Sequence, residues 1–195
     1  VVLGARVHDE LSAPPPRATV QKAEKGLTGT PWTPLLRQSL QLQSARWVYP
    51  SREHSRSQLS LGASTNAGRF ARHLYPSLKA AVPDCPSANY VEEFLRIAAL
   101  LHDIGHGPFG HFFDDNYLLQ FDLTHEKVGQ HIIRTELADI IKAVRRSPSG
   151  EFGKGERLNP DQVAFLIGKG PGAYSSRQPR WVVFLQPMLS GIYTV

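Results

Sequence analysis

The sequence predicts an all-α fold, and three observations lead to this prediction. Apolar residues recur at helical spacing over residues 63–79, 90–103 and 125–145. Connections that contain proline, glycine or serine separate these stretches. Asn159, followed by a proline and an acid, is a typical beginning of a helix. We therefore expect a bundle of helices.

The start of the chain differs from the rest. Residues 1–34 contain a run of three prolines and several turn-like stretches, so we expect loops or short strands there. Residues 35–195 carry the helical patterns and are predicted to form one domain. Because the chain begins with valine and its one methionine is Met188, we expect a piece of a longer protein, cut off at the C-terminal end of this domain.

Length and composition restrict the class of protein. Of the 195 residues, 41% are hydrophobic and 20% are charged, which suits a globular domain rather than a disordered chain. No apolar run approaches the roughly 18 residues of a membrane span, and no signal-peptide layout opens the sequence. We therefore expect a cytoplasmic protein with no membrane partner. The single cysteine, Cys85, excludes an intrachain disulfide and a cysteine-based zinc cluster.

Two helices are expected before residue 80. The first begins at Leu35 and is stopped by Pro50. Residues 51–62 are polar and are expected to form a turn that leads into the second helix, which runs to about Lys79. The apolar side of the second helix is expected to consist of Ala67, Phe70, Ala71 and Leu74.

The strongest helical pattern lies at residues 90–103. Its apolar run is almost continuous, so we expect this helix to be buried on most sides. Glu92 and Glu93 lie near its start, where the helix dipole favours anions. Gly105 and Gly107 are expected to end it.

Three further segments complete the predicted bundle. Residues 125–145 are expected to form one amphipathic helix. Asn159 opens another helix, which ends near Gly168. Residues 168–180 are rich in glycine, proline and serine and are expected to be a loop, and 181–195 begin a last apolar segment.

Histidines concentrate in one part of the sequence. Five of the eight lie within 30 residues, next to the carboxylate of Asp103. They are His102, His106, His111, His125 and His131. Imidazole and carboxylate together suit a divalent metal such as Mn, Fe, Zn, Co or Ni. Burying so many imidazoles beside a carboxylate costs free energy unless something satisfies them, so we expect the cluster to have a function.

Two details of this cluster follow from helical spacing. His102 and His106 are four residues apart, so they would share a face if the helix continued that far. His131, and His73 in the preceding helix, lie at positions that are expected to be exposed and without a special role.

One string of this sequence resembles the signature of the HD-domain phosphohydrolases. It reads His102-Asp103-Ile104-Gly105-His106-Gly107-Pro108-Phe109-Gly110-His111 and is followed by Phe112-Phe113-Asp114. The extension with Gly-Pro-Phe and a further histidine resembles the deoxynucleoside triphosphate triphosphohydrolase branch, which is dGTPase-like. Similar elements lie in order over most of residues 27–145, Thr124-His125-Glu126 among them. The resemblance implies an HD-domain helical bundle.

The resemblance also implies a metal site and catalytic groups. His102 and Asp103 would be the central pair that binds a divalent metal, which could be Mn, Fe, Zn, Mg, Co or Ni. Asp103 would also be catalytic, together with His106, His111 and His125, which would position, protonate or activate groups at the phosphates.

The substrate implied by the resemblance is a deoxynucleoside triphosphate (dNTP). Arg56 matches an arginine that contacts the triphosphate, a role that suits a permanently charged, bidentate donor. Gln41 and Leu42 match positions that contact the sugar and base. The implied reaction is attack of water on the α-phosphorus, with release of a deoxynucleoside and inorganic triphosphate.

Two departures from the family pattern predict impaired turnover by this chain. Leu59 stands where the family has its first metal-binding histidine, and leucine cannot bind a metal. His54, five residues earlier, is a weak candidate for a substitute ligand. We also expect the chain to stop short of the family's last metal-binding aspartate.

Two other functions are left open by the sequence. A catalytically inactive HD module that binds nucleotide or nucleic acid agrees with Leu59 and with the net charge of +5. Another HD-type phosphodiesterase or nucleotidase is the second alternative, which the Gly-Pro-Phe-Gly-His extension disfavours. The dNTP is the expected partner, and a nucleic acid and a second copy of the chain are further partners that the sequence allows.

Overall fold

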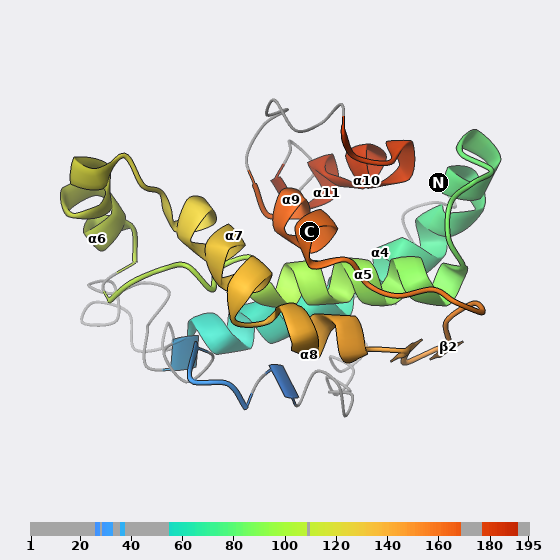
Figure 1. The fold of residues 1–195 in the computed structure, drawn as a ribbon, viewed down its shortest axis with the longest axis horizontal. Coiled ribbons are helices and arrows are strands. Elements are labelled where there is room, and N and C mark those ends of the chain that lie inside the picture. The colour runs from blue at the N-terminus through green and yellow to red at the C-terminus, as the bar shows by residue number, and fades with distance from the viewer. Residues whose placement is uncertain are drawn as a thin grey trace, which may run out of the picture.

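Helices make up most of the structure, as the sequence predicts. The computed structural model describes residues 26–27, 29–32, 36–37, 55–108, 110–168 and 177–190. In this part of the chain the helices are accompanied by a short hairpin, so the all-α class is confirmed (Figure 1). None of the described helices is long and apolar enough to span a membrane.

The elements below position the site and keep one order along the chain. They are α4 (Arg56–Ala81), α5 (Ala88–Leu101), α6 (His111–Asn116), the 3-10 helix η2 (Leu118–Phe121), α7 (His125–Thr135), α8 (Ala138–Ala143), β1 (Arg146–Ser147), β2 (Gly150–Glu151), α9 (Pro160–Leu166), α10 (Arg180–Leu185) and α11 (Pro187–Ser190). The strands β1 and β2 pair antiparallel, with Arg146 opposite Glu151.

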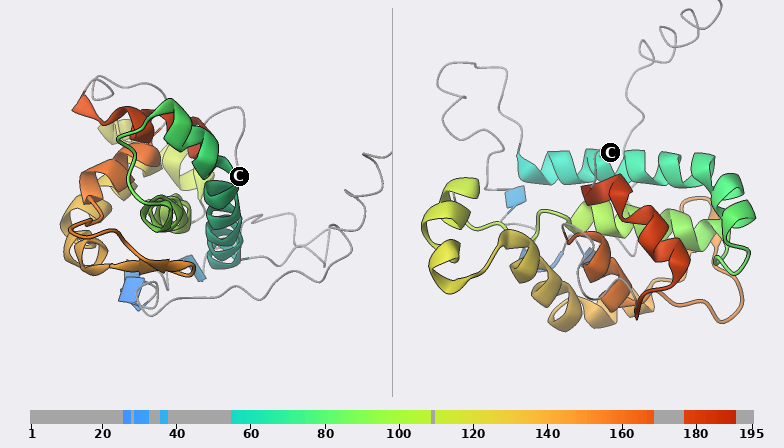
Figure 2. Two further views of the ribbon diagram at one scale, coloured as in Figure 1. Left: turned by 90° about the vertical axis from the view of Figure 1, so that its right-hand side faces the viewer. Right: turned by 90° about the horizontal axis from the view of Figure 1, so that it is seen from above.

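Helix α5 is the centre of the fold. Every residue from Tyr90 to Leu101 is buried, which confirms the expected burial of this segment. Seen end-on, α5 has other helices around it (Figure 2). Helix α10 covers its first half, where the rings of Phe94 and Trp181 lie 5.0 Å apart. The last helical residue, Leu101, directly precedes the His-Asp pair, so the buried helix delivers that pair to the interior.

Helix α4 begins earlier than the sequence analysis expects. Residues 56–62 are helical rather than a turn, because Ser55 forms a capping box with Gln58. The Ser55 hydroxyl accepts a hydrogen bond from the Gln58 backbone N–H at 3.3 Å, and the Gln58 side chain accepts one from the Ser55 N–H at 3.1 Å. The capping box therefore places Arg56 in the first turn of a helix.

The buried side of α4 also differs from the expectation. Phe70 is 47% exposed, although the apolar pattern assigns it to the buried side together with Ala67 and Ala71, which are buried. Small residues face the core instead, because α4 packs closely on α5. A Cβ added at Gly68 would lie 3.0 Å from the Arg96 side chain, so a phenylalanine would not fit in this interface.

The predicted helix over residues 125–145 is two helices. Helix α7 ends at Thr135 and α8 begins at Ala138, with a turn at Glu136 and Leu137 between them. No glycine or proline marks this turn in the sequence. Leu137, in this turn, is buried in the core together with Ile133 and Ile141.

The acids of α5 lie deeper than a position near a helix terminus suggests. Glu92 and Glu93 are both buried. The Ser147 hydroxyl of the hairpin donates a 2.8 Å hydrogen bond to Oε2 of Glu92, and Nε of Arg96 lies 3.4 Å from Oε2 of Glu93. Buried carboxylates need such partners. The hydrogen bond from Ser147 to Glu92 also fixes the hairpin against α5.

Of the remaining predicted elements, the later ones are found in the structure and the earliest lie mostly outside the described residues. The start of α9 is confirmed, since the Asn159 side chain accepts a 2.9 Å hydrogen bond from the Asp161 N–H. The apolar segment after residue 180 contains α10 and α11. Most of the helix expected between Leu35 and Pro50 lies outside the described residues, as do most of residues 1–34. The division into 1–34 and 35–195 therefore stays a prediction.

We expect Ser55→Ala to lower the free energy of unfolding by about 1 kcal/mol, because the first turn of α4 loses its cap. Urea unfolding followed by circular dichroism measures this. Ser77→Ala, at an exposed position inside the same helix, is the control and should change stability by less than about 0.5 kcal/mol. Equal effects of the two substitutions would contradict the role of the capping box.

Candidate active site

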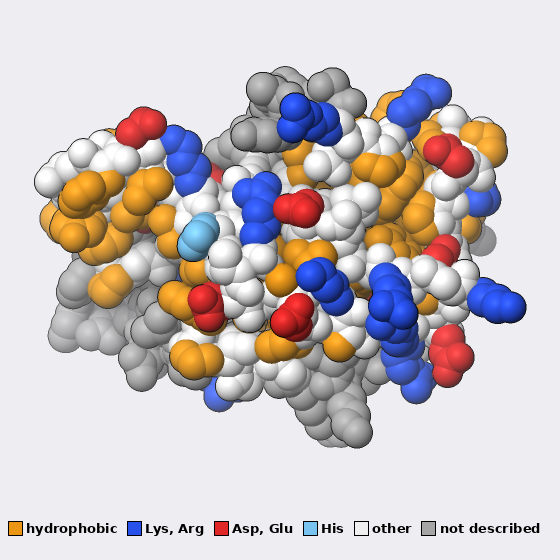
Figure 3. Space-filling model, in the orientation of Figure 1, with side chains coloured by type: hydrophobic (Ala, Val, Ile, Leu, Met, Phe, Trp, Pro, Cys, Tyr) orange, Lys and Arg blue, Asp and Glu red, His pale blue; other side chains and the backbone are white. Residues whose placement is uncertain are grey.

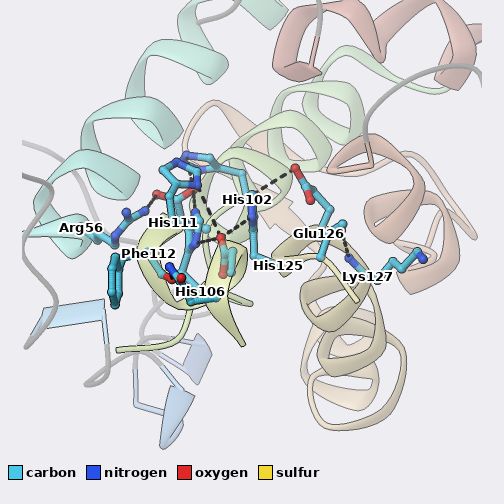
Figure 4. A network of polar contacts seen from close by, with 12 residues as sticks. Arg56, His102, His106, His111, Phe112, His125, Glu126 and Lys127 are labelled. Atoms are coloured by element: carbon cyan, nitrogen blue, oxygen red, sulfur yellow. Dashed lines mark hydrogen bonds and ion pairs between the residues drawn. The ribbon is translucent and has the colours of Figure 1, made fainter. Parts of the chain in front are cut away.

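The histidine cluster lies where three segments meet. His102 and Asp103 follow α5, His111 and Asp114 belong to α6, and His125 is the first residue of α7. Arg56 reaches the same place from the first turn of α4 (Figure 4). A cavity of about 220 Å³ opens here. It is lined by Arg56, Leu59, His102, Asp103, His106, His111, His125, Glu126, Ile167 and Leu189.

Asp103 is surrounded by groups that can carry positive charge. Nη1 of Arg56 donates a 3.0 Å hydrogen bond to its Oδ2, and both side chains are buried. Nε2 of His102 lies 3.3 Å and Nε2 of His106 lies 3.5 Å from its Oδ1. The buried carboxylate is thus compensated by a permanent cation on one oxygen and approached by two imidazoles on the other.

The His102 ring has a defined tautomer when it is neutral. Its Nδ1 lies 2.6 Å from the backbone carbonyl of Ala99. A carbonyl oxygen only accepts hydrogen bonds, so Nδ1 carries the proton and the lone pair of neutral His102 is on Nε2. This lone pair points toward Oδ1 of Asp103, and a proton or a metal ion between the two atoms would relieve the repulsion.

A second carboxylate, Asp114, gathers three imidazoles. Its Oδ2 lies 2.9 Å from Nδ1 of His106, 3.4 Å from Nδ1 of His111 and 2.8 Å from Nδ1 of His125. The rings of His106 and His125 are stacked with centroids 3.7 Å apart. The sequence analysis assigns no role to Asp114. Its spacing of three residues from His111, at the start of a short helix, is the signal that could have identified it.

Burial keeps His106 uncharged at neutral pH. Desolvation is the largest cause that lowers the pKa of His106 to about 4, and the neighbouring His125 and Arg56 lower it further. Asp103 and Asp114 act in the opposite direction but do not compensate. A neutral His106 offers one N–H and one lone pair, so it can donate to only one of the two carboxylates at a time.

Close backbone contact joins the motif to α7. A Cβ at Gly105 would lie 2.0 Å from the carbonyl oxygen of His125 and 2.4 Å from the backbone nitrogen of Gly129. Only glycine allows the chain after α5 to approach α7 this closely. This approach is what brings the His106 and His125 rings into contact.

A larger cavity adjoins the cluster on the side of α6 and α7. Its volume is about 480 Å³. It is lined by His111, Asp114, Asp115, Leu119, Leu123, Thr124, His125, Glu126, Lys127, Gln130 and Gly168. His111, His125 and Glu126 line both cavities, so they form the wall between them.

The structure brings together most of the residues that the sequence singles out. Arg56, His102, Asp103, His106, His111 and His125 all line the smaller cavity. His102 and His106 do not share a helix face as the spacing suggested, because α5 ends at Leu101, and they meet through Asp103 instead. His73 and His131 are exposed. Gln41, Leu42 and His54 lie outside the described residues.

The donors present do not complete the metal site that the motif implies. His102 and Asp103 supply two ligand atoms, Nε2 and Oδ1, which lie 3.3 Å apart. Leu59, which the resemblance to the family places at a third ligand position, lines the same cavity and offers no donor atom. Since catalytic metal sites usually have three protein ligands, the described residues leave this position one donor short.

The comparison with known protein families agrees with the geometry. The HD domain matches residues 60–174, a range that includes the whole histidine cluster. The chain belongs to the HD-domain family. The resemblance that the motif string indicates is therefore confirmed for this HD-domain chain, and the family classes it with hydrolases that bind divalent metals. The cluster of His106, His111, Asp114 and His125 could hold such an ion.

Three curated relatives of this HD-domain chain carry the same activity in their names. The SAMHD1 homolog of Dictyostelium discoideum, named a deoxynucleoside triphosphate triphosphohydrolase, is 37% identical over 79 residues, which are 40% of this chain and 15% of the relative. SAMHD1 of Bos taurus, with the same activity in its name, is 34% identical over 125 residues, 58% of this chain and 20% of the relative. SAMHD1 of Danio rerio is 34% identical over 155 residues, 78% of this chain and 24% of the relative. The chain thus spans a quarter or less of each relative's length.

We expect Gly105→Ala to lower the free energy of unfolding by at least about 2 kcal/mol, because the new methyl group meets backbone atoms that cannot move aside. Thermal and urea unfolding measure the loss. Gly62→Ala is the matched control, since a Cβ at Gly62 in α4 meets nothing within 4 Å, and it should be neutral or stabilising by up to about 1 kcal/mol. A Gly105→Ala protein as stable as the wild type would show that the close approach is not required.

Proposed function

We propose that this chain binds a deoxynucleoside triphosphate in the smaller cavity and hydrolyses it to a deoxynucleoside and inorganic triphosphate. In this reaction a water oxygen bonds to the α-phosphorus, the bond from phosphorus to the sugar O5′ breaks, and O5′ takes up a proton. The activity in the names of the relatives supports this choice of substrate. The cavity also contains an arginine and several histidines, which suit a polyanion.

The observation that carries the proposal is an unsatisfied donor on Arg56. Nη1 of this arginine is bound to Asp103, but within the described part of the chain its buried Nε has no hydrogen-bond acceptor. A buried N–H without an acceptor costs about 1–3 kcal/mol. A phosphate oxygen in the cavity would satisfy Nε, and because Asp103 holds the other side of the guanidinium, the donor is already oriented for it.

The histidines fit the phosphate end of such a substrate. His106, His111 and His125 face the same cavity as Arg56, and we assign to them the positioning of the phosphate and of the attacking water. His111 is the accessible member, because its side chain is 68% exposed, whereas the His106 side chain is buried. The lining also contains Leu59, Ile167 and Leu189, which suit the less polar part of a nucleotide.

A second candidate function is nucleotide binding without turnover. Leu59 favours it, because the metal position between His102 and Asp103 lacks a third donor. The two candidates share the binding step and differ in the product. Measuring bound dNTP and released triphosphate on the same preparation separates them.

Arg56→Lys should raise the dissociation constant of a dNTP about tenfold, because lysine keeps the charge but loses the planar, bidentate donor. This corresponds to about 1.4 kcal/mol. Isothermal titration calorimetry in the presence of a chelator measures binding without turnover, and wild-type affinity should fall as salt is added.

The matched control is Arg69→Lys, at an exposed position of the same helix, which should leave the dissociation constant unchanged. Unchanged affinity in Arg56→Lys would remove the observation on which the proposal rests. Absence of dNTP binding by the wild-type chain would do the same.

Leu59→His should increase both metal affinity and triphosphate release, because an imidazole at this position adds a third donor beside His102 and Asp103. We expect the wild-type chain to turn over slowly and the rate with added Mn²⁺ to rise at least about tenfold in the variant. Phe70→His adds an imidazole at an exposed position of the same helix and should change neither quantity. A wild-type chain that already turns over at the rate of Leu59→His would show that Leu59 is no obstacle.

A further inference from the structure

We propose that His106, His111, Asp114 and His125 form a binding site for one divalent ion of the Zn²⁺ or Co²⁺ type, separate from the His102-Asp103 pair. The inference rests on the proposed function only in that three of the four residues, His106, His111 and His125, line the smaller cavity, whereas Asp114 lines the larger one. It deepens that function, because these histidines would then meet a phosphate through the ion rather than directly.

The four side chains already have the spacing of a metal site. One ligand atom from each of them lies within 4.8 Å of all the others. Bond lengths of about 2.0–2.1 Å place the donors of a tetrahedral Zn²⁺ ion about 3.4 Å apart. The distances from Oδ2 of Asp114 to the three Nδ1 atoms are 2.8, 2.9 and 3.4 Å, so the set needs to open only slightly to admit an ion.

Three polar atoms of this set, on Asp114 and His106, lack hydrogen bonds in the part of the chain that the structure describes. Asp114 is only 7% exposed, and within the described residues neither of its carboxylate oxygens has a hydrogen-bond partner. Nδ1 of His106 has none either, although it lies 2.9 Å from Oδ2. The atoms therefore converge without the geometry of hydrogen bonds. A cation between them satisfies lone pairs that would otherwise remain buried at a cost in free energy.

In two of the three imidazoles, the ring nitrogen that faces away from Asp114 lies near another carboxylate. The far nitrogen of His125, Nε2, lies 3.1 Å from Oε1 of Glu126, and the far nitrogen of His106 lies 3.5 Å from Oδ1 of Asp103. Histidines that bind metals almost always direct their second ring nitrogen at such an acceptor, which fixes the tautomer and makes the ligating nitrogen more basic. An array built only to hold a phosphate would not need this arrangement on the outer side.

Composition and access determine the kind of ion. Three imidazole nitrogens and one carboxylate oxygen suit Zn²⁺, Co²⁺ and similar ions, whereas Mg²⁺ prefers oxygen ligands and keeps several waters. His111 is exposed, and His111 and His125 border both cavities, so an ion can arrive from solvent without opening the core. Both cavities also leave room for a water or a phosphate oxygen at an additional coordination position.

The test is metal binding by the purified 195-residue chain after chelator treatment. Zn²⁺ is titrated by calorimetry, and Co²⁺ is used as a spectroscopic probe because its visible absorption intensifies in four-coordinate nitrogen and oxygen sites. We expect one ion per chain and an intense Co²⁺ band. His111→Ala and Asp114→Asn should weaken Zn²⁺ binding at least about tenfold. Loss of a hydrogen-bond partner of a metal ligand already lowers metal affinity about 10- to 100-fold, and these variants lose a ligand itself.

Two variants define the alternatives. His131→Ala removes an exposed imidazole from α7, and His102→Ala removes a donor of the other position, and both should keep Zn²⁺ affinity within about threefold of the wild type. Loss of binding in His102→Ala with unchanged binding in His111→Ala would place the ion at the His102-Asp103 pair and overturn the proposal. No Zn²⁺ binding by the wild-type chain would overturn it as well. Far-UV circular dichroism and thermal unfolding verify that every variant is folded.

The outcome is independent of the substrate. Binding of dNTP is measured separately in chelator, so a chain that binds dNTP but no Zn²⁺ contradicts only the metal site. A chain that binds Zn²⁺ at these four residues but no dNTP contradicts only the proposed function.

Discussion

The carboxylate of Asp103 follows directly after a helix that is buried on all sides, and compensation of its charge organises the site. A single buried carboxylate is costly, and removing the partner of a buried charge is costlier still. Arg56 supplies the permanent positive charge from the first turn of α4. The start of that helix, its capping box and its packing on α5 therefore all contribute to one ion pair, which in turn fixes the direction of the guanidinium.

His106 connects this ion pair to the second carboxylate. One of its ring nitrogens faces Asp103 and the other faces Asp114. Because burial keeps the ring neutral, it cannot donate to both carboxylates, and some of the polar atoms around it lack hydrogen bonds. Such a set of atoms does not stabilise the fold, but it can bind a proton, a cation or a ligand. The free-energy cost of these unsatisfied atoms is local, and the packing of the surrounding helices holds them in place.

The sequence predicts the fold where local signals decide the structure. The burial of α5 follows from its continuous apolar run, and the start of α9 follows from Asn159 and its proline. Local signals fail for α4, since its buried side contains serines and a glycine that pack against α5, whereas Phe70 faces outward. In α4 a contact with a distant segment overrides the local pattern. Local signals fail again between α7 and α8, where no glycine or proline marks the turn at Glu136 and Leu137.

The site was predictable to the extent that a contiguous motif contains it. His102 through His111 are close in sequence, and the motif identifies them. Asp114 was missed because its importance lies in contacts with His106 and His125, which approach it from other segments of the chain. The roles of Gln41, Leu42 and His54 stay predictions, because these residues lie outside the described part of the chain.

Leu59 and Asp114 distinguish the two positions at which an ion could bind. The leucine stands where the resemblance to the family places a ligand and offers no donor atom, whereas Asp114 has three imidazoles around it. The two positions are joined by Asp103 and His106, so an ion or a proton bound at one changes the charge that the other experiences. A histidine at position 59 would add a donor atom beside His102 and Asp103. With leucine there, the larger set of donor atoms is the one around Asp114. Each substitution is therefore best interpreted through the charge that it leaves on Asp103, which belongs to one position and faces Nε2 of His106 at the other.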